Sequence, residues 1–191
     1  MKTTFIPLSD ASSSKEAIQK IHRLRHDIFI QTVGRDDLSH WNKFEYDVWD
    51  TGLFASVYVL LEDDDGLPIG VARLVSSVET TMLEANHPEF LEKPHDKTPD
   101  LWEIQRLGVR LDMGPIKIER AILFMLSEIS VWLLSRGVKR VMLLTYTGIA
   151  KKRLEAMRPM GPEHMLVGAP HIALEGELDS AEIEIWMQRY R

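Results

Sequence analysis

The chain has 191 residues, of which 45% are hydrophobic, and its formal net charge is -6 at pH 7. This length allows one domain with a sizeable core, and the acidic balance argues against nonspecific nucleic-acid binding. The absence of cysteine excludes disulfides, thiolate metal sites and a thiol nucleophile. No apolar run approaches the roughly 20 residues of a membrane helix. The first ten residues, MKTTFIPLSD, lack the apolar core of a secretory signal. We therefore expect a cytoplasmic protein with a single domain over residues 1–191 and no membrane span.

The first part of the chain predicts a helix and then a hairpin of two strands. Apolar residues recur at helical spacing from Lys15 to about Thr32, and three serines at 12–14 precede them as an N-cap region. The apolar segments 54–61 and 67–75 predict two strands joined by a turn at 62–66. Three aspartates in that turn resemble a metal site, but a solvated hairpin tip is the favoured interpretation.

The second part of the chain alternates strands and helices. In order, we expect a strand at 101–111, a helix at 116–135, a strand at 138–145, a basic helix at 148–157, one or two strands in 165–174 and a last strand at 183–187. Pro115 before the long helix and Gly137 after it are typical of helix ends. A strand, a long helix and a strand predict a right-handed crossover. The whole order predicts an α/β class fold with three layers, α/β/α, around a central mixed sheet.

The acidic segment 45–50 is the first candidate for a binding site. Asp47 and Asp50 are three residues apart, so on a helix or turn they face the same way. Two carboxylates this close repel each other unless a cation lies between them. The amine or sulfonium of a ligand would be such a cation, and Tyr46 and Trp49 would add cation–π attraction. An exposed helix-capping loop explains the same spacing equally well.

Charged residues inside apolar strands are the second candidate. On a regular strand Glu103 and Gln105 share one face, whereas Arg106 points to the other face unless a β-bulge intervenes. A bulge at a catalytic strand would bring the two charges together, and the alternative is two separate charges or a pair with Arg73. Arg73 lies mid-strand between apolar residues, where an arginine usually forms an ion pair and less often binds a ligand carboxylate.

Basic residues gather late in this acidic chain. Seven of the 23 basic residues lie in one short region: Arg136, Lys139, Arg140, Lys151, Lys152, Arg153 and Arg158. This local reversal of charge predicts a surface for an acidic partner, reached by electrostatic steering. A solvated helix face is an equal alternative, and membrane-surface binding is less favoured because the helix lacks a strong apolar face.

Other common functional motifs are missing from the sequence. There is no glycine-rich nucleotide loop and no serine nucleophile elbow. His22 and His26 have the i, i+4 spacing of a metal-binding helix. Without a matching acid cluster they are better interpreted as surface or packing residues. We therefore expect no metal.

Four segments taken together resemble the motif series of the acyl-homoserine-lactone synthases, the bacterial autoinducer synthases. These segments are Arg25–Phe29, Glu45–Asp50, Gly70–Leu74 and Trp102–Leu107. Their order and approximate spacing both fit, and a weaker similarity continues through 145–148 and 168–170. The resemblance covers most of the chain and implies an α/β/α fold similar to that of the Gcn5-type N-acetyltransferases.

The resemblance also implies a reaction and a set of site residues. The substrates would be S-adenosylmethionine and an acyl group on acyl carrier protein or coenzyme A, with no further cofactor. The products would be an N-acyl-homoserine lactone quorum-sensing signal and methylthioadenosine. Carried over residue by residue, the site would contain Arg25, Phe29, Glu45, Asp47, Asp50, Arg73, Glu103 and Arg106.

Roles within this set follow from the chemistry of the implied substrates. Aspartates would hold the ammonium and sulfonium, and an arginine would hold the carboxylate. Glu103 or Glu45 would be the general base, so that Glu45, Glu103 and Arg106 form the expected catalytic set. Thr145 matches a region that lines the acyl pocket in the family. The expected docking residues for carrier protein are Lys151, Lys152 and Arg153.

The sequence departs from the family pattern at several positions. Arg35 stands where the family usually has tryptophan, and Trp41 is a nearby candidate to replace it. Gln105 and Leu107 stand where the family often has serine and phenylalanine. Two other functions are compatible with the sequence. One is an N-acetyltransferase using acetyl-coenzyme A, which Pro115 disfavours because it offers no N–H to a pyrophosphate. The other is a non-catalytic module that binds S-adenosylmethionine or acyl carrier protein.

Overall fold

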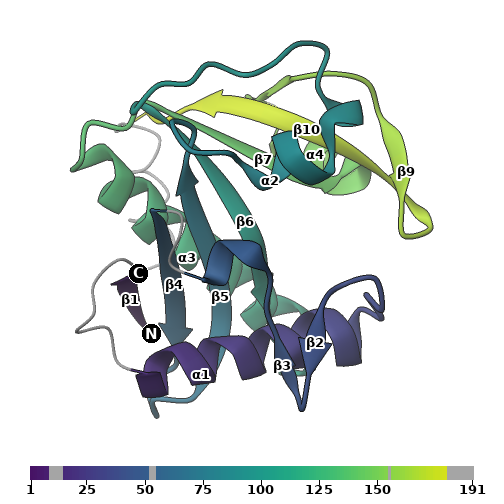
Figure 1. Ribbon diagram of the computed structural model, residues 1–191. Helices are drawn as coiled ribbons and strands as arrows, with labels where there is room; N and C mark the ends of the chain where they lie inside the picture. The colour runs from purple at the N-terminus through teal and green to yellow at the C-terminus, as the bar shows by residue number, and fades with distance from the viewer. Residues whose placement is uncertain (9–14, 52–54, 155, 180–191) are drawn as a thin grey trace.

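One eight-stranded sheet runs through the molecule in the order β1-β4-β5-β6-β7-β10-β8, with β9 paired to β10 (Figure 1). The strands are β1 (Lys2–Pro7), β4 (Ser56–Glu62), β5 (Pro68–Ser76), β6 (Leu101–Val109), β7 (Arg140–Tyr146), β8 (Arg158–Pro159), β9 (His164–Leu166) and β10 (Ala169–Glu177). β6 and β7 are parallel and the other neighbours are antiparallel. This confirms the predicted mixed sheet.

The computed structural model describes residues 1–8, 15–51, 55–154 and 156–179. The predicted N-cap region at 12–14 and the predicted last strand at 183–187 lie outside these residues. The first strand, β1, was not predicted from the sequence.

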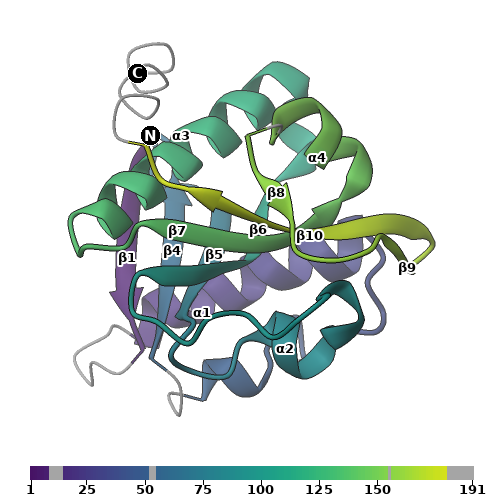
Figure 2. The same ribbon diagram turned by 90° about the horizontal axis from the view of Figure 1, so that it is seen from above.

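Helices cover both faces of the sheet (Figures 1 and 2). They are α1 (Lys15–Arg25), α2 (Met82–Asn86), α3 (Pro115–Leu134) and α4 (Thr147–Arg153). A π-helix (His26–Thr32) continues α1, so the predicted helix over 15–32 is present in two forms. The short elements are 3₁₀ turns at Val48–Asp50, Pro88–Phe90 and Leu111–Met113 and a hairpin of β2 (His40–Trp41) and β3 (Phe44–Glu45).

The central strands are buried on both faces, which explains their nearly continuous apolar sequence. In β4, Val57 and Val59 pack in the core beneath α3. Tyr58 and Leu60 point the other way and pack in the core beneath α1. The predicted three-layer α/β/α arrangement is therefore confirmed, with an apolar core on each side of the sheet.

The parallel strands β6 and β7 pair over a short stretch only. Leu101–Glu103 pair with Arg140–Met142. Beyond these residues the described parts of the two strands have no further mutual pairs, so their facing edges separate toward Tyr146. Beyond Glu103, the backbone N–H and C=O groups on this edge of β6 are therefore not used in pairing with the described part of β7.

β6 approaches the π-helix closely at Gly108. An added Cβ there would lie 2.9 Å from Cζ of Phe29 and 3.0 Å from Cγ2 of Ile28. We expect Gly108→Ala to displace Phe29 and to lower the free energy of unfolding by about 1–3 kcal/mol, measured by urea denaturation. Gly148→Ala is the matched control, because nothing lies within 4 Å of its added Cβ. Equal unfolding midpoints for Gly108→Ala and wild type would contradict this account.

Candidate active site

Three arginines and three acidic residues form one buried ionic cluster between α1 and the sheet. They are Arg25 at the end of α1, Glu45 in β3, Asp47 and Asp50 at the 3₁₀ turn, Arg73 in β5 and Arg106 in β6. Three positive and three negative charges balance. Such a cluster is stable in a low-dielectric interior only because each charge has partners. All six are residues that the sequence predicted for the site.

Asp50 is the centre of the cluster. Its Oδ1 accepts from Nη1 of Arg25 at 2.8 Å and from Nη1 of Arg73 at 2.6 Å. Burial alone would raise the pKa of Asp50, but the positive charges of Arg25 and Arg73 outweigh burial and hold that pKa well below its ordinary value. Asp50 is therefore ionised, and it fixes two guanidinium groups at once.

Asp47 combines features of both sequence interpretations. It caps the 3₁₀ turn, since its Oδ1 accepts from the Trp49 N–H at 3.0 Å and its own N–H donates to Asp50 Oδ2 at 2.7 Å. It is not an exposed loop residue, however, because Arg73 donates to both of its oxygens, at 2.5 and 2.8 Å. The cations beside the two aspartates are arginines of the protein, and mid-strand Arg73 is ion-paired.

Arg25 is wholly buried and has one donor to spare. Its Nε donates to Oε2 of Glu45, and its Nη1 donates to Asp50. Its Nη2 has no hydrogen-bond partner among the described residues and lies 3.7 Å from Asp47 Oδ2. A buried guanidinium N–H without a partner is costly. This atom is therefore suited to receive an anionic group of a ligand.

A β-bulge turns Arg106 into the cluster. The pairing of β5 with β6 shifts register between Val71 and Arg73, and Arg106 has a φ of +50°. Its Nε lies 3.3 Å from Glu45 Oε1 and its Nη2 lies 3.1 Å from Asp47 Oδ2. The bulge that would bring Arg106 and Glu103 together is thus present. Among the described residues, the Nη1 of Arg106 has one hydrogen-bond partner, the Met82 sulfur, a weak acceptor, at 3.3 Å.

Glu103 lies beside the cluster and, unlike the three acids of the cluster, does not pair with an arginine in the described residues. Its carboxylate accepts from the N–H groups of Met82 and Leu83, at 2.9 and 3.1 Å, at the start of α2. Gln105 donates to it at 2.5 Å and accepts from Arg73 Nε at 2.8 Å, which links Glu103 to the cluster. Complete burial raises the pKa of Glu103 to about 7, against the effect of these donors. A carboxylate with this pKa both accepts and releases a proton near neutral pH.

The structure adds residues that sequence reasoning did not assign to the site. Gln105, the N–H groups of Met82 and Leu83, and Tyr58 all contact its charged groups. Only Gln105 had a signal in the sequence, because it shares a strand face with Glu103.

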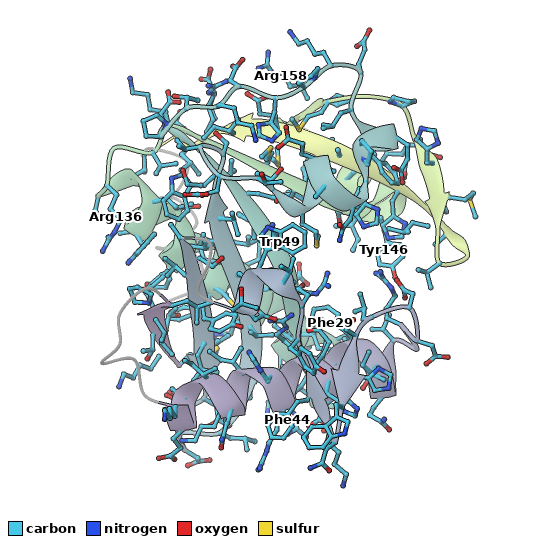
Figure 3. The ribbon with its side chains drawn as sticks, viewed as in Figure 1. Phe29, Phe44, Trp49, Arg136, Tyr146 and Arg158 are labelled. Atoms are coloured by element: carbon cyan, nitrogen blue, oxygen red, sulfur yellow. The ribbon has the colours of Figure 1, made fainter. Side chains whose placement is uncertain are left out.

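Phe29 lies against Gly108 of β6, and Thr145 lies in β7. Phe29 is half-buried in the π-helix, and Figure 3 shows it across from Tyr146 at the end of β7. Thr145 is half-buried, pairs with Ile172 and follows Leu143 by two residues. It therefore points to the α3 face of the sheet, not to the face that carries Glu103.

The described members of the predicted basic surface lie on several different elements. Arg140 and Arg158 each donate to Glu175 at 2.9 Å, and Arg136 stacks on Trp132 at 3.6 Å. Figure 3 places Arg136 and Arg158 far apart. The remaining members in α4 are Lys151, which is exposed, and Lys152 and Arg153, whose side chains lie outside the described part of the structure.

The loop that departs from the family pattern has its own ion pair. Arg35 donates to both oxygens of Asp37, at 2.7 and 2.7 Å. Trp41, the candidate to replace the family tryptophan, is 69% exposed. It does not fill a buried position in the site.

Within the described residues, no group of three or more His, Asp or Glu side chains is arranged to hold a metal ion. The three aspartates at 63–65 lie in the turn between β4 and β5, as the hairpin-tip interpretation predicts. No helix in the described ranges is long and apolar enough to cross a membrane.

No protein-family model matches the chain, but individual proteins do. An acyl-homoserine-lactone synthase of Ralstonia nicotianae is 26% identical over 165 residues, which cover 82% of this chain and 80% of the relative. An acyl-homoserine-lactone synthase of Ralstonia solanacearum is 24% identical over 165 residues, which again cover 82% of this chain and 80% of the relative. In sequence and in fold the chain is similar to proteins of this family.

Solved structures support the same similarity. The coenzyme A-dependent acyl-homoserine lactone synthase BjaI, with S-adenosylmethionine and isopentyl-coenzyme A, has a TM-score of 0.84 at 20% identity, covering 97% of this chain and 87% of BjaI. The acyl-homoserine-lactone synthase LasI has a TM-score of 0.80 at 19% identity, and the match covers 99% of this chain and 95% of LasI. A putative N-acetyltransferase from Lactobacillus plantarum has a TM-score of 0.60 at 18% identity, covering 94% and 100%. The likeness to N-acetyltransferases agrees with the predicted fold.

Proposed function

We propose that the protein is an acyl-homoserine-lactone synthase, an acyltransferase that joins an acyl thioester to S-adenosylmethionine and then closes the lactone. The observation that carries the proposal is the buried cluster of three arginines and three acids beside a carboxyl group whose pKa is about 7. A substrate with a carboxylate, an ammonium and a sulfonium needs such a mixture of charges. The similarity to synthases of Ralstonia supports the same reaction.

S-adenosylmethionine would bind where the cluster is least complete. The buried Nη2 of Arg25 and the Nη1 of Arg106 are donors without a strong acceptor among the described residues, and we assign them to its carboxylate. Asp47 is the most exposed acid of the cluster, with 15% of its side chain accessible. We assign it to the ammonium group of the substrate. Asp50 would then hold the arginines in place without contacting the substrate.

Glu103 is the better of the two proposed bases. Both oxygens of Glu45 already accept from guanidinium groups, those of Arg25 and Arg106. Glu103 would take a proton from the substrate ammonium, so that the amine attacks the thioester carbonyl. The nitrogen–carbon bond forms as the carbon–sulfur bond breaks. Of the two protons that the ammonium loses, one goes to the leaving thiolate and one reaches solvent.

The second step closes the ring. The substrate carboxylate attacks its own γ-carbon, the bond from that carbon to the sulfonium breaks, and methylthioadenosine leaves. Arg106 would orient the carboxylate for this attack, which makes it the third member of the proposed catalytic set. No residue needs to supply an electron or a further group.

The acyl donor would enter where β6 and β7 separate. Open N–H groups on the facing strand edges would bind the thioester and its oxyanion. Phe29 and Thr145 flank this region, and we keep both as proposed substrate contacts. We also keep Lys151, Lys152 and Arg153 as the proposed docking site for acyl carrier protein, with acyl-coenzyme A as the other donor. We propose that the protein acts in the cytoplasm as one domain, without a cofactor.

The direct test is mass spectrometry of reactions containing purified protein, S-adenosylmethionine and a panel of acyl-coenzyme A and acyl-carrier-protein donors. We expect methylthioadenosine and an acylated homoserine lactone to appear together, and neither to form when one substrate is omitted. Thermal stabilisation by S-adenosylmethionine without any product would favour a binding module instead. Acetylation of other amines by acetyl-coenzyme A, with no lactone, would favour an N-acetyltransferase.

A further inference from the structure

A chain of hydrogen bonds runs from the surface of α1 to the centre of the ionic cluster. The Nε2 of His22 lies 2.7 Å from the hydroxyl of Tyr58. That hydroxyl donates to Oδ1 of Asp50 at 2.5 Å. His22 is half-buried on α1, Tyr58 is wholly buried in β4, and neither residue is used by the mechanism above.

The direction of these hydrogen bonds follows from the donors available. Tyr58 has one hydroxyl hydrogen, and Asp50 is ionised and accepts it. His22 must therefore donate from Nε2 to the Tyr58 oxygen. Burial raises the pKa of Tyr58, so its hydroxyl remains a donor across the working pH range. Each donor in such a chain polarises the next.

Tyr58 also contacts Arg25 directly. Its hydroxyl lies 3.4 Å from Nη1 of Arg25, the same nitrogen that donates to Asp50. The guanidinium carbon of Arg25 lies 5.9 Å from the centre of the Tyr58 ring. The hydroxyl and the ring of Tyr58 thus both contact the guanidinium group of Arg25. The Nη2 of that group is left without a partner among the described residues.

We propose that His22 and Tyr58 are positioning residues that hold Asp50 and Arg25 so that Nη2 of Arg25 stays available to the carboxylate of S-adenosylmethionine. The inference rests on the proposed function and adds two residues to it. Without the Tyr58 hydroxyl, Asp50 is free to take up a different hydrogen-bond pattern with Arg25 and Arg73. Affinity for the carboxylate then falls, whereas the acyl donor, which binds elsewhere, is unaffected.

The test compares the two substrates in one set of variants. We expect Tyr58→Phe to raise both KM and the calorimetric Kd for S-adenosylmethionine by roughly tenfold or more, with the KM for acyl-coenzyme A unchanged. His22→Leu should act in the same direction. His22→Gln should recover most of the affinity, because the glutamine amide can donate from the position of Nε2. Ser135→Ala is the matched control, since it removes an exposed hydroxyl that donates to the Trp132 carbonyl at the end of α3, outside the ionic cluster.

Each outcome decides between the two claims. Equal losses with both substrates, or failure of His22→Gln to recover affinity in a folded variant, would reduce the chain to a structural role and overturn the positioning claim. If wild type binds S-adenosylmethionine but makes no lactone, the proposed reaction fails and the Kd values still test the positioning claim. If wild type does not bind S-adenosylmethionine at all, both claims fail. Melting temperatures identify any variant that has unfolded.

Discussion

Replacement of Glu103 by Gln is expected to lower kcat by about 10²–10⁴-fold, the usual contribution of a general base. The substituted glutamine would occupy the same volume at the start of α2, and its one carbonyl oxygen can still accept from the N–H of Met82. The bond from the Leu83 N–H, which donates to the other oxygen of Glu103, is lost. The fold should persist with this one hydrogen bond fewer, while proton transfer is lost. The rate of methylthioadenosine release measures the effect. Glu163→Gln, on an exposed residue, is the control.

The pH dependence of the rate provides an independent check on Glu103. The base must be deprotonated to act, so kcat/KM of the wild type should rise with pH and level off above about 7, the pKa of Glu103. Residual activity of Glu103→Gln should lack this rise. If the same rise persists in the variant, another group is the base.

The ionisation of Glu103 that raises the rate should lower the stability of the folded protein. Burial raises the pKa of Glu103 from 4.5 in an unfolded chain to about 7. Between these values the folded state binds more protons, so this group's contribution to stability falls as pH rises through the window. As pH rises from 4.5 to about 7, the unfolding free energy of Glu103→Gln should increase by about 3 kcal/mol relative to that of wild type. Urea denaturation at several pH values measures this shift.

The layers of the fold were predictable because apolar periodicity is local. The helix expected at 116–135 is α3, Pro115–Leu134, and the strands expected at 67–75 and 101–111 are β5 and β6. The strand β1 was missed because its polar and apolar residues, KTTFIP, give no clear alternation. It is a strand because it pairs with the edge of β4, which is a tertiary contact.

The composition of the site was predictable, but its pairing was not. The charged residues came from the motif series, and six of them do meet in one cluster. That arginines neutralise Asp47 and Asp50 depends on which strands are neighbours, which spacing along the chain does not encode. Arg106 reaches the cluster only through a bulge. Tyr58 resembled an ordinary core residue because it sits in an apolar strand.

Of the substitutions considered, Asp50→Asn in the ionic cluster is expected to lower the unfolding free energy most. Asp50 is the acceptor for Arg25, Arg73 and the Tyr58 hydroxyl. An amide of the same shape leaves an excess of one buried positive charge and presents an N–H where an acceptor is needed. Removal of one member of a buried ion network typically costs about 3–5 kcal/mol, and we expect a loss of that size at pH 7. Asp65→Asn, in the exposed turn, should have almost no effect.

The pH dependence of this loss distinguishes charge from shape. The pKa of Asp50 is depressed in the folded state, so its stabilisation is present above the unfolded value of 3.8 and disappears as pH falls through the lower folded value. The advantage of wild type over Asp50→Asn should therefore shrink progressively in acid, when urea denaturation is repeated at decreasing pH. A gap that stays constant from pH 7 into acid would mean that the substituted asparagine disturbs packing, and that the charge of Asp50 does not hold the two arginines in place.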